Sequence, residues 1–571
     1  MQPSYCVKTV RGFSVKGGNR LFYLKQFTLK KVKYKNHFMR KLFQCYCLPI
    51  IGLVLIFSGG INAQSKSKPN ILFIAIDDLK PELGCYGNKQ IKTPNIDRLA
   101  AMGTVFLSNY CQQAVCGPTR ASLMTGMRPD YTKIWDLKTQ MRDMNPDIVT
   151  LPQYLITQGY TTSGVGKIFH PSSALKKVDP ISWSIPFLFA SDEEYANGLG
   201  APANKQYQKP ETKALFAKGK KAQKESDDDE NPTSTKGPST ECINVPDNAY
   251  EDGVNALKAK KQIIALSKEN KPFFMAVGLH KPHLPFVAPK KYWDLYNKAD
   301  MPLAEFQEHS KNGPEIAYHR SGELRNYTDI PEFATFNEPG NYVRLKKEKQ
   351  QELIQGYYAS VSYTDANVGI LLHTLDSLGT LNNTIIVLWG DHGWHLGDHD
   401  LWEKHTNFEQ ATRAPLIIAA PGMKPGKTKS LSEHVDIFPT ICNLASVAIP
   451  TQLEGTSLKP LMLDNSAKAK EFSMSQYPRK LKKEEMVAKG YADNKMMGYS
   501  IRTEKYRYTI WMNNFTSKQP FNTASVYATE LYDYVKDPLE KSNVVNDKSY
   551  ASISKDLYNK MIAFFKSQEK K

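Results

Sequence analysis

A cysteine and an arginine four residues apart are the residues of this chain best suited to chemistry. They lie in Cys116-Gly-Pro-Thr-Arg120, after the apolar pair Ala114-Val115 and at the predicted start of a helix. Pro118 suits a first helical turn, where free backbone amides favour an anion. Arg120 can make two parallel contacts with an oxyanion. The spacing predicts a nucleophile at Cys116, although an isolated Cys-Gly-Pro would more often be a buried cysteine before a capped helix.

Four segments that predict strands are each followed by charged residues. They span 70–76, 160–166, 272–279 and 384–389, and all but the second are continuous apolar runs. Such runs are typical of strands buried on both faces of a parallel sheet. Open α/β sheets bind ligands at the carboxyl ends of their strands, so the residues that follow should converge on one crevice. These residues are Asp77, Asp78, Lys167, His170, His280, His283, Asp391 and His392.

Asp77 and Asp78 are adjacent carboxylates directly after a predicted buried strand. Without a cation they would repel each other strongly. A hard divalent metal with oxygen ligands removes the conflict, and Asp391 can supply a third carboxylate. His392 could add an imidazole ligand or donate to a bound anion instead. Asp-Asp alone is most often a turn or a helix cap, but its combination with Asp-His-Gly after a second apolar strand favours a metal site.

The intervening segments predict the architecture around this crevice. Helical stretches such as 95–102 and 350–378 alternate with the strands, which predicts an α/β domain over 68–464 with a large, mostly parallel sheet and helices on both faces. From about residue 465 the pattern changes to short alternating segments, and 557–568 predicts an amphipathic helix. Residues 465–571 therefore predict a smaller α+β subdomain with an antiparallel sheet.

Two further segments stand apart from this pattern. Residues 1–63 hold eleven Lys or Arg and no Asp or Glu, and without them the net charge falls from +18 to +7. Arg40-Lys41, the apolar run 47–57 and the small residues that follow predict a cleaved export signal, with Met39 as a possible true start; the alternative is an uncleaved amphipathic anchor. Because most of the positive net charge lies in this leader, the charge gives no reason to expect nucleic-acid binding. The apolar run of the leader is short for a stable membrane span.

Residues 213–237 are almost without apolar side chains and predict a solvated surface loop.

The Cys116–Arg120 segment resembles the signature of the type I sulfatases, Cys-x-Pro-Ser/Thr-Arg. The similarity extends over about residues 68–545 and is greatest to the iduronate-2-sulfatase branch of that family. It is carried by the stretches 77–87, 112–116, 165–171, 276–286, 391–397, 402–408, 475–479 and 497–503. Thr119 stands where serine is usual and Gly117 where alanine is common, and threonine keeps the hydroxyl group.

The resemblance implies an alkaline phosphatase-like sulfatase fold and a specific site. A maturase partner would oxidise Cys116 to Cα-formylglycine, and the hydrated aldehyde would supply the oxygen that attacks sulfur. One Ca²⁺ would be bound by Asp77, Asp78, Cys116, Asp391 and His392. The implied catalytic residues are Cys116, Arg120, Lys167, His170, His280 and Lys404.

The implied roles divide these residues into three groups. Arg120 would fix the hydrated formylglycine, and His170 would help to expel the aldehyde product. Lys167, His280 and Lys404 would contact the sulfate oxygens. Either His280 or Lys404 would be the acid that protonates the leaving group, and the sequence does not rank them. His283 and His405 are left outside the catalytic set.

The expected function is that of an exported, periplasmic or secreted sulfuric ester hydrolase. Its substrate would be a sulfated oligosaccharide derived from a polysaccharide, either a glycosaminoglycan with a 2-O-sulfated terminal uronic acid or an algal polymer such as ulvan or carrageenan. One alternative is a phosphodiesterase or phosphonate monoester hydrolase of the wider alkaline phosphatase superfamily. Another is a carbohydrate-binding relic without activity, which would be favoured by a missing nucleophile or metal ligand, and none is missing.

Overall fold

Seven strands form the large sheet, and the four predicted strands are neighbours in it. The computed structural model describes residues 68–171, 173–174, 178–225, 237–330, 344–491, 493–513 and 525–568. In spatial order the strands are β11 (Gly426–Glu433), β2 (Thr104–Tyr110), β10 (Leu416–Ala419), β7 (Thr384–Gly390), β1 (Asn70–Ile76), β5 (Phe273–Leu279) and β3 (Thr161–Gly166). β10 is antiparallel to both of its neighbours, and the other pairs are parallel. The predicted mostly parallel sheet is confirmed.

Helices cover both faces of this sheet, as predicted. Side chains of the central strand β1 alternate between two hydrophobic cores, with Leu72 and Ile74 in one and Ile71 and Phe73 in the other. The helices that contribute to the first core are α2 (Pro94–Met102), α9 (Glu251–Leu266) and α11 (Lys347–Ser377). Those of the second core are α3 (Cys116–Thr125), α6 (Leu151–Thr157), α13 (Ile437–Leu444) and α14 (Lys459–Leu463).

The register of the central strands brings their carboxyl ends level with one another. Ile76 at the end of β1 pairs with Leu279 of β5 on one side and with Gly390 of β7 on the other. Backbone hydrogen bonds continue one residue beyond the strands, because the Asp77 amide donates to the Leu279 carbonyl and the Asp391 amide to the Ile76 carbonyl, both at 3.1 Å. The residues that follow the strands therefore start from one edge of the sheet.

A second sheet contains four antiparallel strands in chain order. They are β12 (Phe472–Lys480), β13 (Lys495–Thr503), β14 (Tyr506–Asn513) and β15 (Val526–Asp533). Helix α16 (Ala551–Gln568) packs on this sheet through Leu557 and Met561, which share a core with Met497 and Tyr499. The predicted antiparallel sheet and closing helix are confirmed. β12 also meets the chain just before Cys116, because the Gln476 amide donates to the Gln112 carbonyl at 2.7 Å.

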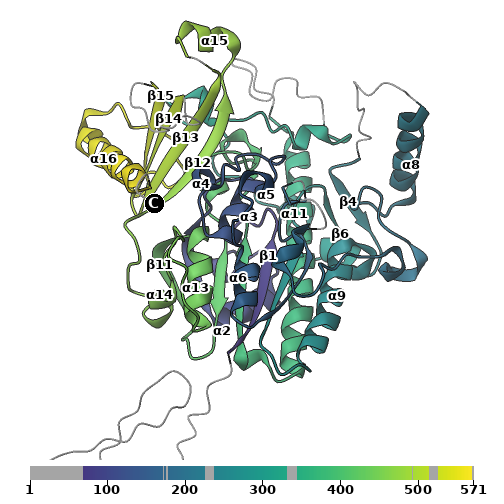
Figure 1. Cartoon of the computed structure of the whole chain (residues 1–571). Helices are drawn as coiled ribbons and strands as arrows, with labels where there is room; N and C mark the ends of the chain where they lie inside the picture. The colour runs from purple at the N-terminus through teal and green to yellow at the C-terminus, as the bar shows by residue number, and fades with distance from the viewer. Residues whose placement is uncertain are drawn as a thin grey trace, which may run out of the picture. The chain divides into compact units, whose positions relative to one another are not determined.

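A helix occupies the first part of the segment predicted to be a surface loop. Helix α8 spans Pro210–Glu225, at the right of Figure 1. Its Ala, Lys, Gln and Glu residues are strong helix formers, and the buried Phe216 ring stacks on Tyr207 with the ring centroids 5.4 Å apart. The loop expectation is therefore wrong for 213–225, because helix propensity and one apolar anchor outweigh the polar composition. The acidic run 226–230 lies outside the described residues.

Short elements complete the described part of the chain. Two small two-stranded sheets pair β4 (Thr240–Ile243) with β6 (Phe286–Pro289) and β8 (His395–Leu396) with β9 (Trp402–Glu403). The short helices are α4 (Pro129–Thr132), α5 (Met141–Met144), α10 (Lys290–Trp293), α12 (Glu409–Thr412) and α15 (Lys483–Ala488). The expected export signal at 1–63 lies outside the described residues. Within them, no helix is both long and apolar enough to cross a membrane.

Candidate active site

Cys116 is the first residue of α3 and lies inside the protein. Val115 before it is extended, with φ −158° and ψ 139°, so the helix starts at the cysteine, and every residue of α3 is buried. The Cys116 Sγ lies 3.4 Å from Nε2 of His392 and 3.8 Å from Nζ of Lys167. Burial and, secondly, the Asp77 carboxylate raise the pKa of the thiol well above its usual value. The unmodified side chain is therefore a neutral thiol at pH 7.

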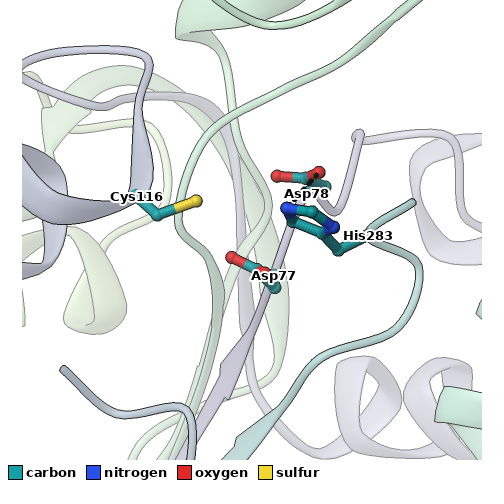
Figure 2. Close-up of side chains that lie close together, drawn as sticks. All are labelled: Asp77, Asp78, Cys116 and His283. Carbon is teal, nitrogen blue, oxygen red and sulfur yellow. Dashed lines mark ion pairs between the residues drawn. The ribbon is translucent and has the colours of Figure 1, made fainter. Parts of the chain in front are cut away.

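Three buried carboxylates face the cysteine from the ends of two adjacent strands. Asp77 and Asp78 follow β1, Asp391 follows β7, and all three side chains are inaccessible to solvent. Asp78 has a positive φ of 56°, and its amide donates to Oδ1 of Asp391 at 3.0 Å. Nε2 of His392 lies 3.4 Å from Oδ1 of Asp78. Figure 2 shows the Cys116 thiol pointing from the start of its helix toward Asp77, Asp78 and His283.

Arg120 contacts two of these carboxylates. Its Nε donates to Oδ2 of Asp391 at 2.9 Å, and its Nη2 lies 3.2 Å from Oδ1 of Asp77. Nη1 donates to the backbone carbonyls of Lys167 and Ile168. One turn of α3 separates Arg120 from Cys116, so the arginine fixes the helix start against the strand ends.

Two lysines complete the positive side of the site. Lys167 follows β3, and its ammonium donates to Oδ2 of Asp77. Lys404 comes from the segment after β9, and its Nζ lies 3.2 Å from Oδ2 of Asp78 and 4.8 Å from the centre of the Trp394 ring. Both ammonium groups are buried. Cationic donors held in a dry site are the stabilisers that a transferring sulfuryl group requires.

The donor set fits a hard divalent cation. Burial raises the pKa of Asp78 well above its usual range, and Lys404 offsets this only in part because Asp77, Glu323 and Asp391 add negative charge nearby. Burial acts on Asp77 as well, but Lys167 and Arg120 outweigh it and lower the pKa. A divalent cation would supply the positive charge that Asp78 lacks. The ligand atoms lie within 4.8 Å of one another in two groups, Asp77, Asp78, Cys116 and His283, and Cys116, Asp391 and His392.

The two histidines of His280-Lys-Pro-His283 occupy different positions. His280 lies beside Asp252 of α9, with Nδ1 at 3.8 Å from Oδ1, and Asp252 also accepts the backbone amides of His280 and Lys281 at 2.8 Å. His283 faces the carboxylates, with Nε2 3.9 Å from Oδ2 of Asp78. Sequence reasoning left His283 outside the catalytic set, and its spacing from the strand end was the only signal for it.

His170 and Glu323 lie near the lysines. Burial and the Lys167 charge lower the pKa of His170 to about 3, so its imidazole is neutral at pH 7. Glu323 lies directly before a single helical turn (Leu324–Asn326) and contacts Nζ of Lys404 at 2.8 Å. No motif in the sequence singled out Glu323. The structure thus places Cys116, Arg120, Lys167, Lys404 and the expected metal ligands in one buried group.

Comparison with known proteins gives consistent matches over nearly all of the described chain. A family model described as sulfatase matches residues 69–447, and one described as N-sulphoglucosamine sulphohydrolase, C-terminal, matches residues 397–567. Iduronate 2-sulfatase of Homo sapiens is 34% identical over 555 residues, which cover 87% of this chain and 96% of that protein.

Two solved structures share the fold. One, in complex with its substrate D-glucosamine-2-N,6-O-disulfate, has a TM-score of 0.64 at 22% identity and covers 88% of this chain and 98% of that chain. The other is the phosphonate monoester hydrolase of Agrobacterium radiobacter, with a TM-score of 0.64 at 21% identity and coverage of 88% and 96%.

Proposed function

The chain belongs to the sulfatase family, and we propose that it is an exported enzyme that uses a Cα-formylglycine at Cys116 and a bound Ca²⁺ to hydrolyse O-sulfate esters of oligosaccharides. The family and the sulfatase activity expected from the sequence are confirmed by the family model and the human relative, and the expected fold by the two solved structures. One observation carries the proposal: the Cys116 thiol faces a buried group of three carboxylates, two lysines and one arginine. Burying so many charges costs folding free energy. These charged side chains surround one position, that of the proposed nucleophile.

The residues proposed to hold Ca²⁺ are Asp77, Asp78, Asp391 and His392, together with the modified side chain at position 116. When bound, the ion would polarise a sulfate oxygen and balance the negative charge of substrate and carboxylates. The proposed ligands are held in place, because the Asp78 amide donates to the Asp391 carboxylate and Arg120 contacts the carboxylates of Asp77 and Asp391.

The remaining residues would bind and orient the reacting groups. Oxidation of Cys116 would replace its thiol with an aldehyde whose hydrate carries the attacking oxygen. Arg120 would hold this side chain in place through the start of α3. Lys167, which contacts Asp77, and Lys404, which contacts Asp78, would donate to the sulfate oxygens as charge develops on them. His170, neutral at pH 7, would accept the proton as the aldehyde is restored.

The acid that protonates the leaving group is proposed to be His280 or Lys404, the two residues that the sequence offered. His283 faces the carboxylates of the site, whereas Nδ1 of His280 faces Asp252. Burial lowers the pKa of His283 to about 3, so its imidazole is neutral at pH 7 and does not supply this proton.

A sulfated oligosaccharide is the proposed substrate. The human relative is named for iduronate, and one structural match was solved with a disulfated glucosamine. The net charge of +7 outside the predicted leader would attract a polyanion at low salt. Release of sulfate from heparin, ulvan and carrageenan oligosaccharides by the matured enzyme tests this proposal and separates glycosaminoglycans from algal polymers. Activity restricted to small aryl sulfates would contradict it.

Formylglycine formation has a direct test. We expect the tryptic peptide containing Cys116, purified after co-expression with a formylglycine-generating maturase, to show the mass loss of thiol-to-aldehyde conversion. Cys116→Ala should abolish turnover and leave binding of sulfated sugar intact. An unmodified thiol in fully active enzyme would rule out the mechanism, and full activity of the alanine variant would rule out the nucleophile.

A phosphonate or phosphodiester hydrolase is the second candidate. The phosphonate monoester hydrolase matches this chain with the same TM-score as the sugar-sulfate complex, so the fold alone does not separate the two activities. Competing 4-nitrophenyl sulfate against the corresponding phosphonate and phosphate esters decides between them. We expect preference for the sulfate, and a preference for phosphonate would reverse the assignment.

A further inference from the structure

Glu323 joins two proton-bearing groups of the site through its two carboxylate oxygens. Oε1 lies 3.1 Å from Nε2 of His283, and Oε2 lies 2.8 Å from Nζ of Lys404. Both partners also approach Asp78, at 3.9 Å for His283 and 3.2 Å for Lys404. The carboxylate of Glu323 therefore fixes the separation between the ammonium and the imidazole on the side of the site that faces Asp78.

The backbone around Glu323 is held by its packing on the segment that carries Lys404. The Leu324 amide donates to Oε1 of Glu403 at 2.8 Å, and the Leu324 side chain is fully buried. The Trp402 amide donates to Oγ of Ser321 at 3.2 Å. Hydrogen bonds on both sides of Glu323 thus tie its segment to the residues that flank Lys404, so the side chain approaches Lys404 from a fixed backbone.

The ring of His283 has an acceptor at each nitrogen. Its Nδ1 contacts the Leu284 carbonyl, and its Nε2 faces the Glu323 carboxylate. Burial lowers the pKa of His283 to about 3, so the neutral ring carries one N–H and donates to only one of these two acceptors. Without Glu323, Nε2 would lose its nearest acceptor, and Lys404 would be left with Asp78, a residue proposed to bind the metal.

From this geometry we propose that Glu323 is a positioning residue that aligns Lys404, with His283 beside it, for transfer of an ammonium proton to the leaving-group oxygen as the S–O bond breaks. The inference rests on the proposed function, because it assumes that a sulfate ester is cleaved in this site. Glu323 does not touch the reacting atoms and acts through the two groups that it holds. A third member orienting a general acid or base in this way is a recurrent arrangement in hydrolases.

Leaving-group dependence distinguishes this role from a structural one. 4-Nitrophenolate departs without help from an acid, whereas a sugar alkoxide must be protonated. We expect Glu323→Gln to lower kcat on a sugar O-sulfate by about 100-fold, the scale of general acid catalysis, and kcat on 4-nitrophenyl sulfate by less than about 5-fold. KM for both substrates should change by less than about 3-fold, because the ligands of the metal remain.

Glu82→Gln is the matched control. Glu82 also pairs with a buried lysine, Lys80, at 2.8 Å, and its side chain is 32% exposed compared with 22% for Glu323, but it contacts neither lysine of the site. This variant should retain wild-type kcat on both substrates. Equal losses on both substrates in Glu323→Gln, or no loss on either, would overturn the positioning role.

Two further measurements keep the outcome interpretable. Glu323→Asp retains the charge and should recover part of the loss on the sugar sulfate. If Glu323→Gln does not fold, the test is the ratio of kcat on the sugar sulfate to kcat on 4-nitrophenyl sulfate in Glu323→Asp. A ratio equal to that of the wild type overturns the role. Bound metal and the mass of the Cys116 peptide should match the wild type in both variants. Failure of the wild-type enzyme on every sulfate ester would instead contradict the proposed function itself.

Discussion

At the scale of single residues, the charged side chains of the site can be buried only because they pair with one another. Asp77 is inaccessible to solvent, and Lys167 and Arg120 both contact it. Asp78 is equally buried but has Lys404 as its main cation and three carboxylates nearby. Removing one charge from such a group leaves its partners buried and unpaired, so single substitutions should have effects far larger than those of surface ion pairs.

Asp77→Asn should weaken metal binding and lower kcat/KM by more than about 100-fold, because it removes one carboxylate from a hard-cation site. Metal content after dialysis against EDTA and titration with Ca²⁺ measures the first effect, and sulfate release the second. Asp365→Asn is the control, since Asp365 is also buried but accepts the amides at the start of α2 instead. Unchanged metal content in Asp77→Asn would remove the residue from the ligand set.

The two histidines of the 280–283 loop should differ in their effect on turnover. His283→Ala should reduce kcat on sugar sulfates by at least about 100-fold, because this imidazole faces the carboxylates. His280→Ala should cost less than about 10-fold, since His280 lies beside Asp252. Steady-state rates of both variants on one sugar sulfate provide the comparison. The reverse order would make His280 the histidine on which turnover depends.

At the scale of elements, the site is assembled where strand ends, a helix start and the second sheet meet. β1, β5 and β7 end level with one another, and α3 begins with Cys116, the proposed nucleophile position. β12 contacts the chain before Cys116 through the amide of Gln476. Helix α12 joins the two sheets further, because Glu409 pairs with Arg502 of β13 at 3.0 Å and with Arg507 of β14 at 2.7 Å. The antiparallel sheet therefore supports the large sheet close to the site.

Glu409→Gln should lower the free energy of unfolding at pH 7 by about 2 kcal/mol, the scale of a buried charged hydrogen bond. Burial raises the pKa of Glu409, but Arg502, Arg507 and Arg413 outweigh it and hold the pKa below its usual value. A lowered folded-state pKa stabilises the fold above the unfolded pKa of about 4.3 and loses this contribution as the pH falls below it.

Thermal melts between pH 7 and pH 3 test this assignment. The difference in Tm between wild type and Glu409→Gln should be constant down to about pH 5 and should shrink below it. Glu504→Gln removes an exposed ion pair with Lys468 and should change Tm very little. A difference between wild type and Glu409→Gln that grows toward acid pH would contradict the assigned ionisation.

At the scale of the whole molecule, the folded protein encloses Cys116, the proposed nucleophile position. All residues of α3 are buried between the sheet and neighbouring helices, and Cys116 is 3% exposed. None of the five described cysteines is in a disulfide, and Cys242 is the most exposed of them. The thiol of Cys116 also has a raised pKa. We therefore expect maturation to act on the chain before α3 is buried.

Thiol accessibility checks this expectation. In folded protein made without a maturase, iodoacetamide should alkylate Cys242 faster than Cys116 by at least about 10-fold, because only the thiolate reacts and Cys116 is buried and protonated. Peptide mass spectrometry over time measures both rates. In denaturant the two rates should converge. Rapid alkylation of Cys116 in the folded chain would show that the site is open to a modifying enzyme.

The sequence was sufficient for those parts of the protein that depend on short-range spacing. The apolar runs that end in Asp77 and Asp391, and the Cys116–Arg120 spacing at a helix start, predicted the sheet, the site edge and most of its residues, because strand ends in a parallel sheet converge whatever their connections. Helix α8 was missed because a polar composition was given more weight than helix propensity.

Only the tertiary structure decided the rest of the site. It places His283 rather than His280 beside Asp78, because the direction of each ring depends on the path of the loop beyond β5 and on its contacts with Asp252. It brings Glu323 to Lys404 from a segment about 80 residues earlier, held there by hydrogen bonds to the Glu403 side chain and the Trp402 amide. Such contacts arise from packing between distant segments, and no local pattern of residue types encodes them.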